Sequence, residues 1–205
     1  RDGGTPLRAE SLRQGSPAER FAGRSGPLRL LVVGGSLGAK ALNDTVPQAL
    51  ALIPVDQRPQ VIHQSGEKQI EALRANYEAA GVEAQLTPFI QDTARAFAEA
   101  DLVIGRAGAS TVTEIAAVGA AALFVPFPFA VDDHQTTNAR FLVDAGGAWL
   151  VPQPEFTPAA LAQRLQSLQR DQLMDMATKA QNMKKTEAVA AVVTACEQLA
   201  KVTTA

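Results

Sequence analysis

Short apolar runs alternate with stretches of helical periodicity through most of the chain. The first run, Leu28-Arg29-Leu30-Leu31-Val32-Val33, ends at Gly34-Gly35 and is typical of a buried strand. The pattern predicts further strands at 60–63, 84–87, 102–104, 121–125 and 148–151, with helices between the strands at 39–52, 67–80, 93–100, 111–118 and 135–145. Strands that alternate with helices are joined by right-handed crossovers, so the sheet is parallel and covered on both faces. We therefore predict an α/β protein with a doubly wound parallel sheet of about six strands.

The two ends of the chain depart from this alternation. Residues 158–202 have helical periodicity throughout, with breaks expected near Asp171 and Asn182. Residues 1–27 are rich in glycine, proline and charge, which is typical of a linker or an extended arm. We therefore expect an arm over 1–27 and one domain with a helical tail over 28–205. The start, which has no initiator Met, leads us to expect a piece of a longer protein.

The composition is that of an ordinary globular protein. Of 205 residues, 46% are apolar and 20% charged, which excludes general disorder and allows a sizeable core. The sequence contains no run of about 18 apolar residues, the length that a membrane-spanning helix needs. The first residues also lack the apolar region of a signal peptide. A net charge of −2 gives no basic excess for nucleic acid. The single cysteine, Cys196, excludes a disulfide framework, fits a reducing compartment and is interpreted as a core residue of the tail.

The loop after the first strand is the first candidate for a ligand site, because open α/β sheets bind ligands beyond the carboxyl ends of their strands. It reads Gly34-Gly35-Ser36-Leu37-Gly38 and leads into a helix. Glycines let the backbone approach a ligand, and free N–H groups at a helix start favour an anion such as a phosphate. The loop lacks the spacing of a dinucleotide fingerprint and of a P-loop, so a tight turn with Ser36 as the N-cap stays open.

The second candidate loop runs from Gly105 to Glu114 and again joins a strand to a helix. Its small residues leave room for a ligand at the helix start. Thr111 and Glu114 have the spacing of a capping box. The alternative is that the Glu114 carboxylate accepts hydrogen bonds from both hydroxyls of a ribose. Both readings place Glu114 in the first helical turn.

The third candidate loop runs over 126–138 and opens a helix with a polar cluster. Gln135 and Asn138 are three residues apart and share a helix face, and their amides suit sugar hydroxyls. The alternative is helix capping by Asp132 or Asp133, with His134 merely exposed.

Other chemistries find little support. His63 ends the second strand and is interpreted as packed beside a loop rather than touching a ligand. His134 has no recognisable Ser or Cys partner, which argues against a hydrolase triad. Two histidines and no Asp-x-Asp pair give no metal cluster, and the few aromatic residues form no platform for stacking bases.

In combination, these loops resemble the MurG family, the bacterial UDP-N-acetylglucosamine transferases that convert lipid I to lipid II in peptidoglycan synthesis. The resemblance covers 28 to about 200 and rests on Gly34-Gly35-Ser36-x-Gly38-Ala39 with Leu42-Asn43, His63-Gln64-Ser65-Gly66, Phe89-Ile90, 101–105, Arg106-x-Gly108-Ala109-x-Thr111-x-x-Glu114 and His134-Gln135-x-x-Asn138-Ala139. It implies one half of a GT-B fold, in which two Rossmann-like domains enclose a cleft. This chain corresponds to the C-terminal half, which binds the nucleotide sugar.

The resemblance implies a role for each matching donor-site residue. Gly35 and Ser36 meet the diphosphate, Gly108, Ala109, Ser110 and Thr111 line the phosphates, Ile90 contacts uracil through its backbone, Glu114 holds the ribose, His134, Gln135 and Asn138 read the sugar, and Arg8 completes the set. Two positions depart from the family pattern: Thr5 replaces the usual Asn before Pro6, which weakens the assignment of Arg8, and Ala121 stands where proline is common.

The implied activity is transfer of N-acetylglucosamine from UDP to lipid I with inversion at the anomeric carbon. The acceptor site, the catalytic base and the membrane contact belong to the family's other half, so we expect this chain to bind the donor and not to catalyse. The family works on the cytoplasmic side of the inner membrane and serves cell shape and division; the piece itself is expected in the cytoplasm. No cofactor is implied beyond Mg²⁺ held loosely on the diphosphate.

Two alternatives stay open: the donor subunit of a naturally split transferase, and a non-catalytic or engineered module that binds nucleotide sugars. A UDP-N-acetylglucosamine epimerase is a more remote relative. The sequence leaves the oligomeric state open.

Overall fold

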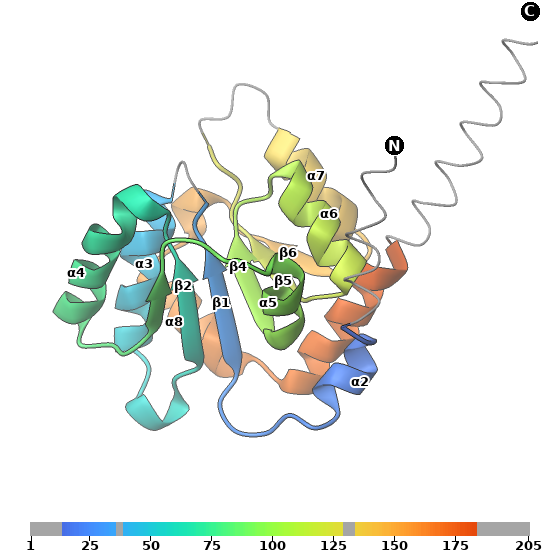
Figure 1. Ribbon diagram of the computed structural model, residues 1–205, viewed down its shortest axis with the longest axis horizontal. Helices are drawn as coiled ribbons and strands as arrows, with labels where there is room; N and C mark the ends of the chain where they lie inside the picture. Colours follow the sequence, from blue (N-terminus) through green and yellow to red (C-terminus); the bar gives the residue numbers. More distant parts are fainter. Residues whose placement is uncertain (1–13, 36–38, 129–133, 184–205) are drawn as a thin grey trace, which may run out of the picture.

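The computed structural model describes residues 14–35, 39–128 and 134–183. Across these ranges one parallel sheet has the strand order β3-β2-β1-β4-β5-β6 (Figure 1). Its strands are β1 (Arg29–Val33), β2 (Gln60–Gln64), β3 (Gln85–Thr87), β4 (Leu102–Gly105), β5 (Ala122–Phe124) and β6 (Ala148–Leu150). The chain moves outward from β1 to β3, returns to the centre at β4 and continues to the other edge. This is the order of a Rossmann-like doubly wound sheet, so the predicted fold class is confirmed.

Helices connect the strands as predicted, with ends that differ by a few residues. They are α2 (Pro17–Phe21), α3 (Lys40–Ala51), α4 (Ile70–Ala80), α5 (Thr93–Glu99), α6 (Ala109–Val118), α7 (His134–Val143) and α8 (Pro158–Ser167), with short 3-10 turns at Val55–Gln57, Glu67–Gln69 and Gln153–Glu155. Residues 170–183 form a further helical stretch.

Two breaks were predicted in the helical tail, and the described residues contain the first of them. The chain leaves helical geometry at residues 168–169, close to the expected break near Asp171. The helix then includes Asn182 and Met183, where the described residues end, so the break expected near Asn182 stays a prediction. Ala177 and Ala180 of this stretch are fully buried. Cys196 lies outside the described residues.

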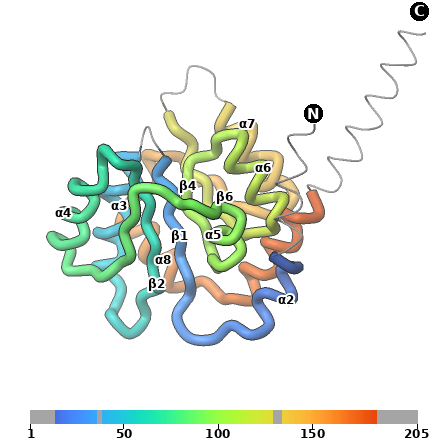
Figure 2. The backbone as a smooth tube through the Cα atoms, in the orientation of Figure 1, coloured from blue at the N-terminus to red at the C-terminus, as the bar shows by residue number. Residues whose placement is uncertain are grey.

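Alternate residues of the strands face two separate cores. Leu30 and Val32 of β1 pack in the first core with α3, α4 and α8. Leu31 packs in the second core with α5, α6 and α7. Figures 1 and 2 show the two helical layers on either side of the sheet. Because successive strand side chains point to opposite faces, a run of apolar residues is what a sheet buried on both sides requires.

The described part of the predicted arm, residues 14–27, is packed on the domain. It contains the short helix α2, whose first turn is capped by the Ser16 hydroxyl, which accepts from the Glu19 N–H at 3.2 Å. Phe21 is buried in the first core, and Arg20 donates to main-chain oxygens at the end of α6. A helix of this length is too short to show periodicity, so the sequence indicates only its capping residues. The boundary at residue 28 stays a prediction.

A buried carboxylate joins the two ends of the described chain at the amino edge of the sheet. Asp101, just before β4, is 0% exposed; its Oδ1 accepts from Nη1 of Arg24 at 2.9 Å and its Oδ2 accepts from Nη2 of Arg170 at 3.0 Å. Oδ2 also accepts from the N–H of Arg29 at 2.8 Å. The arm, β1, β4 and the C-terminal helix therefore share one charged centre whose lone pairs are satisfied.

Asp101→Asn removes the charge that two buried or nearly buried guanidinium groups share. We expect the free energy of unfolding to fall by about 3 kcal/mol, because breaking a buried pair leaves uncompensated charge. Urea denaturation at neutral pH measures the change.

Asp175→Asn is the matched control, because it breaks an exposed pair between Asp175 and Lys179. We expect a loss below about 0.5 kcal/mol there. Equal losses in the two variants would contradict the role given to Asp101.

Candidate functional site

The carboxyl ends of β1, β2 and β4 lie close enough to require glycine. A Cβ on Gly34 would lie 2.8 Å from the carbonyl oxygen of Gln64 and 3.0 Å from Cβ of Ala39, and Gly35 has a φ of +75°. Gly34 therefore allows the close approach, and Gly35 adopts a backbone conformation that other residues resist. The prediction of a tight, glycine-dependent loop at this edge agrees with both observations. Ser36 lies outside the described residues, and the N-cap position of α3 is occupied by Ala39.

Gln64 connects this glycine loop to the loop that follows β3. Its Oε1 accepts from the Gly35 N–H at 3.0 Å, and its Nε2 donates to the carbonyl oxygen of Pro88 at 2.9 Å. Figure 2 shows the segment that leaves β3 and runs toward α5. Ile90 lies on this segment, is partly buried and packs against the second core. No separate role was predicted for Gln64 within the motif His63-Gln64-Ser65-Gly66.

Helix α6 begins with an N-terminus that its own side chains leave uncovered. Its N-cap residue is Gly108, which has no side chain to accept from the first N–H groups, and Ala109 and Ser110 are exposed. The first turn of such a helix combines unsatisfied N–H groups with the positive end of the helix dipole. The arrangement suits an anion at this edge of the sheet.

The capping box predicted for Thr111 and Glu114 is wrong. With Gly108 at the cap, Thr111 is the third residue of α6 and Glu114 the sixth, beyond the first turn. The helix starts two residues earlier than the sequence pattern suggests, because small residues precede the apolar positions that carry the periodicity. Glu114 is partly buried and shares a helix face with Ser110 and Thr111, from which it is separated by one turn.

Gln135 and Asn138 share a face of α7 as predicted, and this face packs on the neighbouring loops. Oε1 of Gln135 accepts from the N–H of Phe127 at 2.8 Å and from that of Ala107 at 3.3 Å. Nδ2 of Asn138 donates to the carbonyl oxygen of Ala107 at 3.1 Å. Gln135 therefore joins the loop after β4 to the loop after β5, and Asn138 attaches α7 to the loop after β4; contact of either amide with a sugar stays a prediction.

Arg106 reinforces the same connection and was given no role in the sequence analysis. Its Nη1 donates to the carbonyl oxygen of Val125 at 3.1 Å, and its guanidinium lies 5.3 Å from the ring centroid of Phe127. Burial lowers the pKa of the guanidinium, which nevertheless stays charged at neutral pH. In the sequence, the only local indication of this role is a large cation within a loop of small residues.

Four further predicted positions include one, His134, that lies within the described residues. His134 is the first residue of α7 and its side chain is exposed. The alternative caps Asp132 and Asp133 lie outside the described residues, and so does Arg8.

His63 is a buried member of a polar relay beneath the glycine loop. It is 0% exposed, its Nδ1 lies 2.7 Å from the Tyr77 hydroxyl and its Nε2 lies 2.9 Å from Oδ1 of Asn43. Because an amide oxygen only accepts, Nε2 carries the proton and Nδ1 accepts from the tyrosine. The prediction that His63 packs beside a loop is confirmed.

Burial fixes the protonation of this relay. Desolvation lowers the pKa of His63 from 6.5 to about 3 and raises the pKa of Tyr77. Both side chains are therefore neutral at physiological pH, and the relay holds α3, β2 and α4 together without a buried charge.

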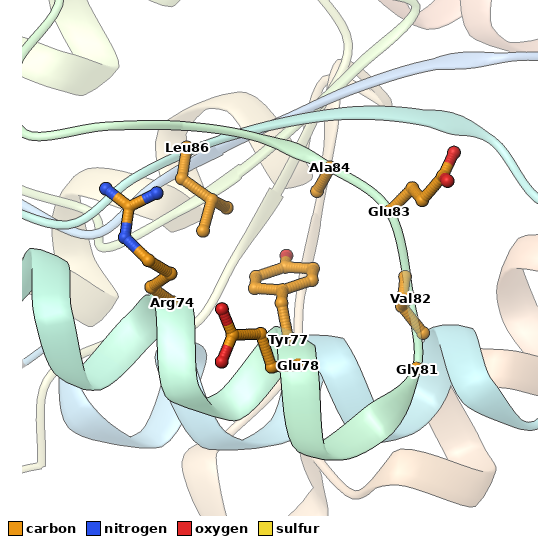
Figure 3. Close-up of a pocket in the computed structure, with 8 residues that line it drawn as sticks. All are labelled: Arg74, Tyr77, Glu78, Gly81, Val82, Glu83, Ala84 and Leu86. Carbon is orange, nitrogen blue, oxygen red and sulfur yellow. The ribbon is translucent and has the colours of Figure 1, made fainter.

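A hollow of about 500 Å³ lies away from this edge, between α4 and the segment that leads into β3 (Figure 3). Arg74, Tyr77 and Glu78 project toward it from α4, and Val82, Ala84 and Leu86 close the other side. None of its lining residues comes from the loops described above. The convergent polar groups at the carboxyl edge are the stronger indication of a site, because this hollow is open to solvent.

The described residues contain neither a cluster of metal-ligating side chains nor a membrane-spanning helix. Within 14–35, 39–128 and 134–183, no three His, Cys, Asp or Glu side chains gather where they would hold a metal ion. The helices in the same part of the chain are too short or too polar for one of them to cross a bilayer.

A Rossmann-like sheet with an uncovered helix start at its carboxyl edge suits a nucleotide ligand. The family match gives the class: residues 29–193 match the glycosyltransferase family 28 C-terminal domain, and the chain belongs to that family.

Full-length relatives in this family are much longer than the chain. It is 69% identical over 198 residues to the UDP-N-acetylglucosamine–N-acetylmuramyl-(pentapeptide) pyrophosphoryl-undecaprenol N-acetylglucosamine transferase of Polaromonas sp. strain JS666, covering 97% of this chain and 51% of the relative. It is 70% identical over 196 residues to the enzyme of the same name from Paracidovorax citrulli, covering 96% of this chain and 55% of the relative. The chain thus spans about half the length of these relatives.

Solved structures show the same half-length match. MurG of Acinetobacter baumannii superposes with a TM-score of 0.76 and 46% sequence identity, over 84% of this chain and 50% of that one. The glycosyltransferase VinC, at 17% identity, has a TM-score of 0.58 over 87% of this chain and 44% of its own, and so shares the fold.

The buried neutral His63 predicts an acid-dependent loss of stability. In the unfolded chain the imidazole takes up a proton below its ordinary pKa of 6.5, whereas in the fold it stays neutral until about 3. Stability is therefore complete above the unfolded pKa and falls as the pH is lowered toward the folded one. Between about pH 7 and about pH 5.5, we expect a loss of about 1 kcal/mol. Urea denaturation at the two pH values measures it.

His63→Gln removes the titrating group while keeping a polar side chain. This variant should lose less than half as much stability over the same pH interval as the unaltered chain. An equal loss would assign the pH dependence to other groups.

Proposed function

We propose that the chain is the donor-binding half of an inverting glycosyltransferase, which transfers N-acetylglucosamine from its UDP donor to lipid I and forms lipid II for peptidoglycan. The observation that carries this proposal is the identity of about 70% with transferases named for this donor and acceptor, over nearly the whole chain. Since the chain spans about half of each relative, the activity of the whole protein, its lipid acceptor and a peripheral position at the inner membrane all belong to the proposal.

The geometry of the carboxyl edge supports a nucleotide diphosphate as the ligand. In our proposal the diphosphate lies between the loop at Gly35 and Ser36 and the start of α6 at 108–111, where N–H groups face the edge. Glu114, one turn further along the same face, holds the ribose. Ile90 contacts uracil, and His134, Gln135 and Asn138 meet the sugar.

The chain contributes positioning and stabilisation of the leaving group. As the bond between the anomeric carbon and the diphosphate breaks, negative charge grows on UDP, and the positive end of α6 is placed to stabilise it. The acceptor hydroxyl attacks the opposite face of the sugar, which inverts the anomeric carbon. We propose that the base and the acceptor site lie in the other half of the protein and that no resident metal is needed, with Mg²⁺ bound loosely to the diphosphate. Donor binding that persists in EDTA, measured by calorimetry, tests the last point.

Glu114→Gln tests the ribose contact. Replacing the carboxylate by an amide removes a charge-assisted pair of hydrogen bonds, and we expect UDP to bind about tenfold more weakly. Calorimetry measures the affinity, and thermal unfolding checks that the fold is unchanged.

Glu83→Gln serves as the control for charge, because Glu83 is exposed and lies ahead of β3, far from the carboxyl edge. Its UDP affinity should match that of the unaltered chain. Equal affinity in Glu114→Gln would remove the ribose role from Glu114.

The chain alone should bind UDP-N-acetylglucosamine weakly and transfer nothing, because the acceptor site belongs to the other half. A coupled assay for UDP release with a lipid I analogue measures turnover. Release that depends on the analogue would contradict the proposal.

Co-purification with a separate acceptor-domain protein would instead favour the donor subunit of a split transferase. The half-length match is equally expected for such a subunit.

A further inference from the structure

The side chain of Gln64 occupies the gap between the two loops that flank the end of β2. Gln64 is the last residue of β2 and is 8% exposed. Its amide oxygen accepts from Gly35 at 3.0 Å, and its amide nitrogen donates to Pro88 at 2.9 Å. Both ends of one planar group are therefore used, each by a different loop.

Main-chain hydrogen bonds continue the sheet up to this side chain on both sides. The N–H of Gly34 donates to the Gln64 carbonyl oxygen at 2.8 Å, and the N–H of Gly66 donates to that of Pro88 at 2.9 Å. The Gln64 side chain thus adds one more link between the loops at the point where the strand ladder ends.

The order of donor and acceptor makes glutamine specific for this position. The glycine loop presents an N–H, and the loop after β3 presents a carbonyl oxygen, so the linking group must accept on one side and donate on the other. A carboxylate has no donor for the carbonyl, and an apolar side chain of the same length satisfies neither loop. When Gln64 is replaced by an apolar residue, the partly buried Gly35 N–H loses its acceptor, whereas the Pro88 carbonyl oxygen loses one of two donors and keeps the Gly66 N–H.

We propose that Gln64 is a positioning residue that sets the separation between the Gly34–Gly35 loop and the loop at Pro88–Ile90. This inference rests on the proposed function, in which the first loop meets the diphosphate and the second meets the base. A nucleoside diphosphate touches both loops at once, so it gains from a fixed separation. A nucleoside without phosphates touches one loop and gains little.

The experiment compares Gln64→Met with Gln60→Met, a matched control at the exposed amino end of the same strand. We expect UDP affinity, measured by calorimetry, to fall about tenfold in the first variant and to stay within about twofold in the control. Uridine affinity, measured by NMR titration, should fall less than about threefold in Gln64→Met. A merely destabilised fold would weaken both ligands alike.

Amide hydrogen exchange of the unliganded protein gives a second readout. Gly35 loses its acceptor directly in Gln64→Met. The N–H of Gly66 keeps its own acceptor on Pro88 and loses protection only if the loop after β3 loosens. Faster exchange at both amides supports the proposal, and unchanged exchange at Gly66 overturns it. If Gln64→Met does not fold, Gln64→Glu replaces it, since the carboxylate still accepts from Gly35 and lacks the donor for Pro88.

UDP affinity within about twofold of the unaltered chain in the Gln64 variant would overturn the positioning role, and so would equal losses for UDP and uridine. If the unaltered chain binds no UDP, the proposed function falls, and the exchange at Gly66 alone decides whether Gln64 couples the loops.

Discussion

The close approach of β1, β2 and β4 at their carboxyl ends is the constraint on which the rest of the structure depends. A side chain on Gly34 would meet the carbonyl of Gln64 at 2.8 Å, and one on Gly105 would meet the carbonyl of Val33 at 3.3 Å. Three parallel strands therefore stay in contact up to their last residues, and the loops that follow leave the sheet side by side. This proximity lets loops from distant parts of the sequence form one edge, where the uncovered N-terminus of α6 also lies.

Side-chain amides connect the loops on both sides of that edge. Gln64 connects the loops after β1 and β3, whereas Gln135 connects the loops after β4 and β5. Asn138 attaches α7 to the loop after β4, and Arg106 adds a cation to the second connection. Amides suit this work because each carries a donor and an acceptor and requires no counter-charge on burial. At the opposite edge of the sheet a charged centre at Asp101 anchors both described ends of the chain, so the two edges are built from different chemistry.

The strands and the interstrand helices were predictable because each carries a local signal. Apolar runs such as Leu30–Val33 are required in a strand buried on both faces, and glycine at 34 and 35 marks the turn. The features that were not predicted correctly also have physical causes. Helix α2 was not predicted because it is short and is held by Phe21 and Arg20, whose contacts lie far along the chain. The capping box at Thr111 failed because Gly108 starts the helix without any side chain.

The sequence by itself determined the fold class, the order of the elements, the glycine loops and the family, since these depend on periodicity, backbone conformation and short motifs. Only the tertiary structure decided which polar side chains face a ligand edge and which hold it together. Gln64, Gln135 and Asn138 have similar amide chemistry in the sequence, and hydrogen bonds to loops 20 or more residues away give them their structural roles. For His63 the sequence already favoured packing beside a loop, and the structure adds its two hydrogen-bond partners, Tyr77 and Asn43. Such partners are distant along the chain, and local sequence carries no information about which of them folding brings together.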